Sequence, residues 1–162
     1  MCSSDLATDA AWGRGNAFAA LGVALTLGEV PREHPARAAM LRSYREHMAK
    51  LLPWQNRDGL WRNVVDQPGA YGEHSATAMI GFAMQRGIAS GWFEDSRPYR
   101  AAVARAWRAV NARTGTDGTV IDVCESTARI ESVEGYMQRE AILGRDPRAG
   151  AMAMLFAAEL MR

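Results

Sequence analysis

The sequence has few cysteines, little net charge and no long hydrophobic run. Cys2 and Cys124 are its only cysteines, so no zinc-ligand pattern or disulfide framework can be recognised. It has 19 basic and 18 acidic residues, which are interspersed and give a net charge of +1. That balance argues against a nucleic-acid patch or a polybasic membrane segment. No apolar run reaches the roughly 18 residues that cross a bilayer. We therefore expect one globular domain without a metal, a nucleic acid or a membrane as partner.

The first ten residues, MCSSDLATDA, differ from the rest of the chain. They show no periodicity, and they lack the positively charged start and the apolar stretch of a signal peptide. The regular pattern begins abruptly at Ala11. We interpret residues 1–10 as a tail or a foreign start, and residues 11–162 as part of a single domain.

Apolar residues recur with helical spacing in five segments, and no stretch alternates long enough to predict a strand. Three segments are small and apolar on nearly all sides, as buried helices are. Two others carry their apolar residues on one stripe, which is typical of helices with a solvent-facing side. The expected fold is therefore all-α. The buried type covers about 16–27, 74–86 and 149–161, and the one-sided type lies within 30–53 and 98–110.

The three buried segments resemble one another and alternate with the one-sided ones. NAFAALGVAL, SATAMIGFAM and GAMAMLFAAE can be aligned, and such a repeat indicates a toroid or solenoid of inner and outer helices. Two long loops, 53–73 and 114–148, each end where an inner helix begins. Loops of that length in compact proteins are usually functional. A plain helical-repeat scaffold without chemistry remains an alternative at this point.

Hydrogen-bonding side chains precede the first inner helix in the phrase AWGRGNAF. A helix N-terminus carries unpaired N–H groups and about half a positive charge, and the planar fork of Arg14 suits a carboxylate. Trp12 and Phe18 offer flat surfaces on which sugar rings stack, and Asn16 can bond a hydroxyl. The alternative is structural: Asn16 caps the helix, Trp12 and Phe18 are core, and Arg14 pairs with a structural acid.

Similar polar clusters precede the other two inner helices. If the inner helices are parallel, all three clusters converge on one concave face, which favours a binding cavity. His74 has two open interpretations, as a donor to a sugar hydroxyl or as a residue that caps or packs. The second cluster contains Tyr71, Glu73, His74 and Ser75, and the third contains Glu125, Ser126, Thr127, Tyr136 and Arg139.

Several phrases in these segments resemble a known family. WGRGNAF, LLPWQNRDGLWRNVVDQPGAYGEHSATAM, GWFEDSRPYRAAVARAWRAV and DGTVIDVCEST…YMQREAILGRDPRAGAMAMLFAAE resemble the C-terminal half of unsaturated glucuronyl and rhamnogalacturonyl hydrolases, glycoside hydrolase families 88 and 105. The resemblance runs from about Trp12 to the last residue. It implies an (α/α)6 barrel, of which this chain would hold about three inner helices with their outer partners. It also implies a substrate that ends in a 4,5-unsaturated uronic acid, left by pectin or glycosaminoglycan lyases, and no cofactor.

The reaction implied by the resemblance is the hydration of an enol ether. An aspartic acid protonates C4, an oriented water adds at C5, and the hemiketal opens to release the remaining sugar. That aspartate lies upstream of the W-x-R-G-N phrase in the family, so we expect this chain to bind substrate without turning it over. Phe18 stands where the family usually has tryptophan, and Ala128 where it often has glycine. The substrate-binding residues expected in this way are Trp12, Arg14, Asn16, Phe18, His74, Ser75, Thr127, Tyr136 and Arg139.

A complete barrel of twelve helices needs well over 300 residues, and this chain supplies about five long helices. The first and third inner helices would then expose apolar sides, which favours self-association. Another (α/α)6 sugar enzyme, such as an epimerase or a lyase, is a further alternative. The low cysteine content and the resemblance favour a cytoplasmic location.

Overall fold

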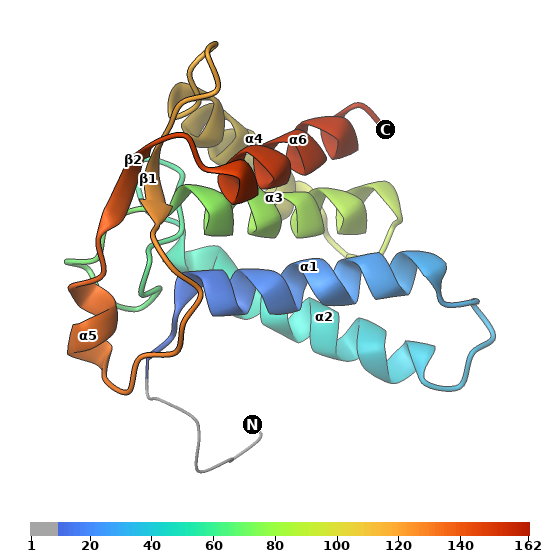
Figure 1. Ribbon diagram of the computed structural model, residues 1–162. Helices are drawn as coiled ribbons and strands as arrows, with labels where there is room; N and C mark the ends of the chain where they lie inside the picture. The colour runs from blue at the N-terminus through green and yellow to red at the C-terminus, as the bar shows by residue number, and fades with distance from the viewer. Residues whose placement is uncertain (1–9) are drawn as a thin grey trace.

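A computed structural model describes residues 10–162, so the tail expected at 1–10 lies almost wholly outside the described residues. Five long helices carry the fold, joined by one short α-helix, one 3-10 turn and two strands (Figure 1). The long helices are α1 (Gly13–Glu29), α2 (Arg37–Leu51), α3 (His74–Ala89), α4 (Arg97–Ala112) and α6 (Pro147–Leu160). The shorter elements are η1 (Leu52–Trp54), β1 (Val120–Cys124), α5 (Val133–Met137) and β2 (Ala141–Gly144).

All five helices expected from the sequence are present, with ends that differ by a few residues. Three of them, α3, α4 and α6, start with side chains or prolines that satisfy or omit the free N–H groups of a first turn. Glu73 accepts hydrogen bonds from the start of α3, and Asp146 does the same for α6. Pro98 and Pro147 occupy the first turns of α4 and α6. Among the described residues, no helix combines the length and the apolar character needed to cross a membrane.

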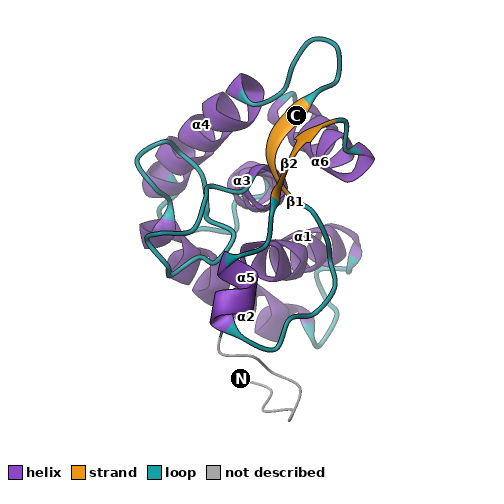
Figure 2. Cartoon of the chain, turned by 60° about the vertical axis from the view of Figure 1, so that its left-hand side comes forward, coloured by secondary structure: helices purple, strands orange, loops and turns teal. Residues whose placement is uncertain are grey.

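The helices form two layers, as the repeat predicts. The helices α1, α3 and α6 run side by side in the same direction, and α2 and α4 lie behind them (Figure 1). Seen toward the N-terminal ends of the inner helices, α3 occupies the centre (Figure 2). Burial agrees with this position, since 13 of the 16 residues of α3 are buried but only four of the 14 residues of α6. The inner helices therefore form an arc with α3 in its middle.

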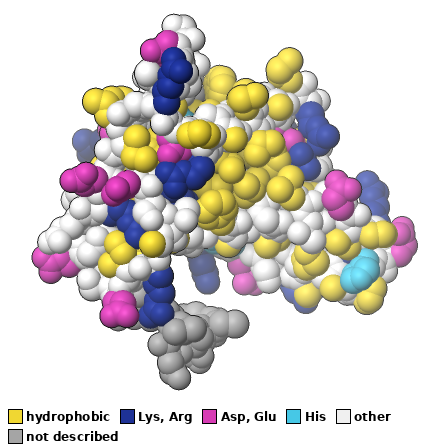
Figure 3. Space-filling view, viewed as in Figure 1, with side chains coloured by type: hydrophobic (Ala, Val, Ile, Leu, Met, Phe, Trp, Pro, Cys, Tyr) yellow, Lys and Arg dark blue, Asp and Glu magenta, His cyan; other side chains and the backbone are white. Residues whose placement is uncertain are grey.

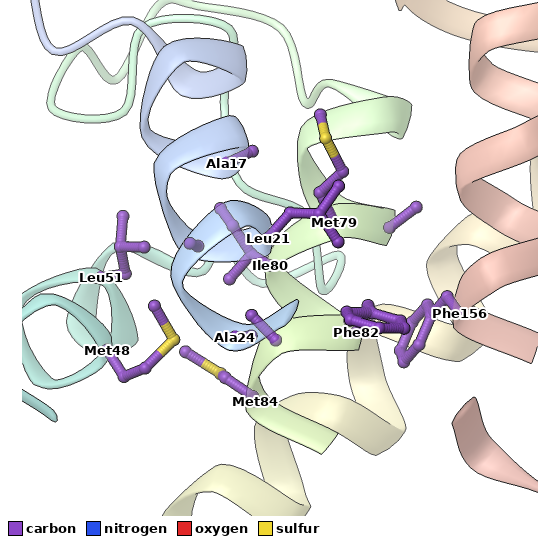
Figure 4. Packing of buried hydrophobic residues seen from close by; sticks show 14 of the residues in the cluster. Ala17, Leu21, Ala24, Met48, Leu51, Met79, Ile80, Phe82, Met84 and Phe156 are labelled. Carbon is purple, nitrogen blue, oxygen red and sulfur yellow. The ribbon is translucent and has the colours of Figure 1, made fainter. Parts of the chain in front are cut away.

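The core surrounds α3, which packs against α1, α4 and α6, and it continues from α1 to α2 (Figure 4). Leu21 and Ala24 of α1 pack beside Ile80 of α3 and Met48 of α2. The approach of α6 to α3 depends on Gly81, because a Cβ atom there would lie 2.5 Å from the ring of Phe156. Small residues on the inner helices thus set the spacing of the arc.

The two strands correct the all-α expectation. They pair antiparallel, with Val123 opposite Ile142, and the register is irregular between Val120 and Val123. At this irregularity Asp122 takes a positive φ of 60°, so inward and outward residues of β1 do not alternate regularly. The partner strand lies some twenty residues further along the chain, beyond the reach of a local pattern. The sequence therefore gives no usable strand signal here.

The end helices of the arc expose apolar side chains, as expected for helices with a free side. Phe18 and Leu25 of α1 are 44% and 41% exposed, and Met154 and Leu155 of α6 are 73% and 40% exposed. Hydrophobic side chains cover much of the face over α6, α3 and α1 (Figure 3). Burial of these side chains needs a partner surface.

Candidate functional site

Both long loops return to the N-terminal ends of α1 and α3, which we call the site end. The first loop contacts the start of α1 through the backbone, where the Gly13 N–H donates to the Asn63 carbonyl at 2.7 Å. Only glycine fits at position 13, because a Cβ atom there would lie 2.2 Å from the Arg62 carbonyl oxygen. The second loop brings α5 and β1 to the same end (Figure 2). Both loops thus bring residues to the site end.

Arg14 lies buried at the centre of the site end, with 1% of its surface exposed. Its Nε donates to Ser75 Oγ at 3.0 Å, and its Nη2 donates to the Cys124 carbonyl at 2.7 Å. The same Nη2 lies 3.3 Å from Glu73 Oε1. Arg14 therefore joins α1 to α3 and β1, and its pairing with an acid matches the structural alternative raised for it. Nη1, the remaining nitrogen, is buried without a hydrogen-bond partner.

Glu73 is the buried anion that organises this cluster. Its carboxylate accepts hydrogen bonds from the N–H groups of Ser75 and Ala76 at the start of α3. It also accepts from the Ser75 hydroxyl at 2.8 Å and from the Cys124 N–H at 2.9 Å. A carboxylate at a helix N-terminus is favoured by the unpaired N–H groups and the helix dipole. Glu73 thus fixes Arg14 and Ser75 relative to each other.

An aromatic cluster lies beside the arginine. The rings of Trp12 and Tyr136 are 5.4 Å apart, and the Arg139 guanidinium lies within 5.4 Å of both ring centres. Arg139 also donates to the carbonyls of Ser126 and Ala128, which holds the segment after β1 against the site end. Cation–π contacts of this kind contribute about 0.5–2 kcal/mol each.

His74 faces α4 rather than the arginine. Its Nε2 lies 3.0 Å from Thr114 Oγ1, whose hydroxyl donates to the Val110 carbonyl. The hydroxyl therefore accepts from His74, which places the imidazole proton on Nε2 and leaves Nδ1 as a free acceptor. Burial lowers the pKa of His74 below its usual value, against the opposing effect of Glu73. The imidazole is thus neutral near pH 7.

Unsatisfied polar atoms gather at the site end. Burial without a hydrogen bond costs about 1–3 kcal/mol per group, so such atoms are rare in folded proteins. Burial, with Cys124 and Glu73 adding to it, raises the pKa of the Tyr71 phenol, so this hydroxyl keeps its proton. Among the described residues, the buried side-chain atoms without a partner are Trp12 Nε1, Arg14 Nη1, Asn63 Oδ1, Asp66 Oδ1, Tyr71 OH and His74 Nδ1.

The remaining expected residues lie apart from this cluster. Asn16 is half-buried, donates to the Trp12 carbonyl at 3.0 Å and lies 3.3 Å from His47 Nε2 of α2. Phe18 is on the exposed side of α1, and Thr127 is exposed in the segment that follows β1. The structure therefore gathers Trp12, Arg14, Ser75, Tyr136 and Arg139, with His74 at the edge.

Asn63 belongs to the site end although the sequence did not single it out. It is fully buried, and its Nδ2 donates to the Tyr136 carbonyl at 2.7 Å. The available signal was a polar amide within the apolar phrase LWRNVV. No group of three or more His, Cys, Asp or Glu side chains could hold a metal ion within the part of the chain that the structure describes.

Comparison with known proteins shows which family this chain matches. The model of Glycosyl Hydrolase Family 88 matches residues 3–162. The unsaturated rhamnogalacturonyl hydrolase YesR of Bacillus subtilis is 33% identical over 127 residues, which are 78% of this chain and 35% of that protein. An unsaturated 3S-rhamnoglycuronyl hydrolase of Formosa agariphila is 32% identical over 67% of this chain and 29% of its own length. The chain thus spans about a third of the curated relatives it matches.

The fold of this chain also matches solved structures of related proteins. A possible member of family 105 from Salmonella enterica has a TM-score of 0.85 at 25% identity, over 94% of this chain and 40% of that one. The unsaturated glucuronyl hydrolase of Bacillus sp. GL1 has a TM-score of 0.65 at 19% identity, over 95% and 40%. This chain is a mostly helical partial domain that matches (α/α)6-barrel structures over about 40% of their length. It belongs to glycosyl hydrolase family 88, the family of unsaturated uronyl hydrolases.

Proposed function

We propose that this chain contributes part of the substrate site of a hydrolase that removes a 4,5-unsaturated uronic acid from the non-reducing end of oligosaccharides. The substrates would be products of lyases that act on pectin or rhamnogalacturonan. The observation that carries the proposal is the buried Arg14, held by Glu73 and Ser75 with Nη1 unpaired, beside Trp12. An unpaired guanidinium nitrogen suits the uronate carboxylate, and the neighbouring ring suits a sugar face.

The proposed roles differ among the nine expected residues. Arg14 would bind the carboxylate, and Trp12 with Tyr136 would contact the sugar ring, while Arg139 holds the two rings in place. Ser75 is occupied by Arg14 and Glu73, so it would position the arginine. For Asn16 and Thr127 we propose contacts further along the oligosaccharide, whereas His74 is buried against Thr114 and Phe18 lies on the exposed side of α1 apart from the cluster, so we propose no substrate contact for these two.

We assign no general acid to the described residues. Protonation of carbon near neutral pH needs a carboxyl group whose pKa is raised by burial or by a neighbouring charge. Asp117 has its pKa lowered by hydrogen bonds from Thr119. The pKa of Asp146 is also lowered, because the hydrogen bonds from Arg148 and Ala149 outweigh the opposing effect of burial. These two aspartates therefore stay ionised, and we propose that the 162-residue chain binds substrate weakly without turnover.

The test uses the 162-residue chain and a disaccharide of 4,5-unsaturated galacturonic acid and rhamnose. Titration followed by nuclear magnetic resonance should shift the indole N–H signal of Trp12, while the ultraviolet absorbance of the double bond stays constant. The methyl ester of the same disaccharide is the matched control, since it keeps the ring and lacks the carboxylate charge. Equal binding of acid and ester, or no binding of either, would contradict the proposed site. Loss of absorbance would show that the chain holds its own general acid.

A further inference from the structure

A pocket in the outer layer, which we call the outer pocket, shares no residue with the site end. Its volume is about 500 Å³, within the range of small-molecule sites. Its walls include Arg45, Glu46 and Ala49 of α2, residues 93–95 of the segment before α4, and Tyr99 in the first turn of α4. Residue 93 follows the C-terminal end of α3, and the 16 residues of that helix separate its two ends by roughly 24 Å. A ligand in the outer pocket would therefore bind independently of one at the site end.

Three aromatic rings lead from the core to the outer pocket. Tyr44 is buried, and its ring centre lies 5.6 Å from that of Phe93. Phe93 in turn stacks on Tyr99, with ring centres 3.8 Å apart and planes inclined by 10°. Phe93 and Tyr99 are both half-buried, and both line the pocket. The stack thus places flat apolar surface in the wall of the pocket and anchors it to the core through Tyr44.

Charged side chains of both signs border this aromatic wall, and the fold holds several of them in place. The Nε of Arg45 donates to the Trp92 carbonyl, and its Nη1 lies 3.7 Å from Glu94 Oε1. Both carboxylate oxygens of Asp95 accept hydrogen bonds from the Arg97 guanidinium, at 3.0 and 2.9 Å. The outer pocket therefore combines an apolar ring surface with fixed guanidinium donors and carboxylate acceptors.

We propose that the outer pocket binds a neutral sugar unit. A sugar ring carries C–H groups on its face and hydroxyl groups around its edge. The C–H face suits the ring of Tyr99, which lines the pocket beside Phe93. A hydroxyl group both donates and accepts hydrogen bonds, so the hydroxyls at the edge can use the carboxylates and the Arg45 guanidinium together.

The balance of charges favours a neutral ligand over a charged one. The carboxylates of Glu46, Glu94 and Asp95 face the guanidinium groups of Arg45 and of Arg97, which is paired with Asp95. A cation could bind over the tyrosine ring, but it would be repelled by Arg45. An anion would be repelled by the three carboxylates. A neutral sugar makes hydrogen bonds to both kinds of group and is repelled by neither.

The test is a titration of the 162-residue chain with methyl rhamnoside and methyl galactoside, two neutral sugars, followed by nuclear magnetic resonance. We expect the ring signals of Tyr99 to shift and saturate with millimolar affinity, while the indole N–H signal of Trp12 stays unchanged. Ala49→Met fills the pocket from an exposed position and should raise the Kd about tenfold or more. Ala39→Met, at an exposed position of the same helix outside the pocket, is the matched control. No shift of Tyr99 with either sugar, or equal effects of the two methionine variants, would overturn the proposal.

Two further measurements identify the ligand class and separate this pocket from the site end. Tetramethylammonium should leave the Tyr99 signals in place, and a shift caused by this cation but by neither sugar would replace the proposal with a cation site. Arg14→Lys should leave the binding of both neutral sugars unchanged. A loss of that binding in Arg14→Lys would overturn the outer pocket as a separate site, whereas failure of the unsaturated disaccharide to bind at Trp12 would leave it standing. Circular dichroism checks that each variant is folded.

Discussion

Two arginine–glutamate pairs hold the inner helices together, and they are built differently. At the C-terminal ends, Arg86 donates to both oxygens of Glu159 at 2.6 Å, the two-bond arrangement that fits a carboxylate best. At the site end, Arg14 reaches Glu73 through one nitrogen at 3.3 Å and uses its other bonds for Ser75 and Cys124. Arg86 thus occupies both oxygens of Glu159, whereas Arg14 has one nitrogen, Nη1, that is buried without a partner.

This difference distinguishes an ion pair that stabilises the fold from an ion pair that lies at the candidate site. The two-bond pair of Arg86 and Glu159 joins α3 to α6, and we assign it no ligand. Arg14 has one buried nitrogen without a partner, and a guanidinium N–H can donate to a further acceptor. The predictions below change one pair at a time.

The largest effect is expected from Glu73→Ala. The variant leaves Arg14 buried without its counter-ion and removes the acceptor for the N–H groups that start α3. Breaking a buried pair in this way costs about 3–5 kcal/mol. Urea unfolding at one fixed protein concentration measures the loss. Glu94→Ala, at a side chain that is 92% exposed, should change the free energy of unfolding by less than about 0.5 kcal/mol.

A smaller loss is expected from Glu159→Ala at the other pair. Arg86 keeps 13% of its side chain exposed, so water can partly solvate the guanidinium after its partner is removed. We expect a loss of about 2 kcal/mol, below that of a fully buried pair. Binding of the unsaturated disaccharide should stay within twofold of wild type. A loss as large as that of Glu73→Ala would show that both pairs are equally buried in solution.

The same conservative substitution in both arginines separates binding from stability. Arg14→Lys keeps the positive charge but replaces the planar guanidinium with a single ammonium group. The ammonium group cannot donate hydrogen bonds to Ser75, Cys124 and a ligand at the same time. We expect disaccharide binding to weaken about tenfold, which corresponds to about 1.4 kcal/mol. Arg86→Lys should lower stability to a similar extent and leave binding unchanged. Calorimetric titration of both variants measures the contrast, and equal binding by Arg14→Lys and wild type would remove Arg14 from the proposed site.

The helices and their layering were predictable because their signals are local. Apolar segments such as SATAMIGFAM indicate a helix that is buried on all sides. The repetition of three such segments indicates parallel inner helices. The strands were missed because the irregularity at Asp122 and the pairing with a distant segment leave no alternation near Val120. Pairing partners far apart in the chain are not recorded in local periodicity.

The positions of the candidate site's residues in the fold were predictable, and their contacts were less so. The phrase W-x-R-G-N placed Trp12 and Arg14 at a helix start, where the structure has them. Which acid faces Arg14 depends on how α3 and β1 are packed, and this made Glu73 a cap, an ion-pair partner and an acceptor at once. Asn63 was missed because one buried amide in an apolar phrase does not reveal its partner.

The smallest expected effect is on pH dependence at the edge of the site end. Burial lowers the pKa of His74 in the folded state, while Arg113 acts in the same direction and Glu73, Asp122 and Asp146 oppose it. The unfolded state therefore takes up a proton first as pH falls. Stability from the neutral imidazole is complete above the unfolded pKa of about 6.5 and is lost as pH falls below it.

His74→Gln tests this sign without removing the donor to Thr114. We expect the wild-type free energy of unfolding to fall between pH 7 and 5, and the variant to show a smaller slope. The difference cannot exceed about 1.4 kcal/mol per pH unit, the value for one proton. Some slope should remain, because burial also lowers the pKa of His47. His34→Gln, at an exposed position, is the matched control and should keep the wild-type slope. A variant of His74 that became less stable than wild type only at acidic pH would reverse the sign and place a charged imidazole in the folded protein.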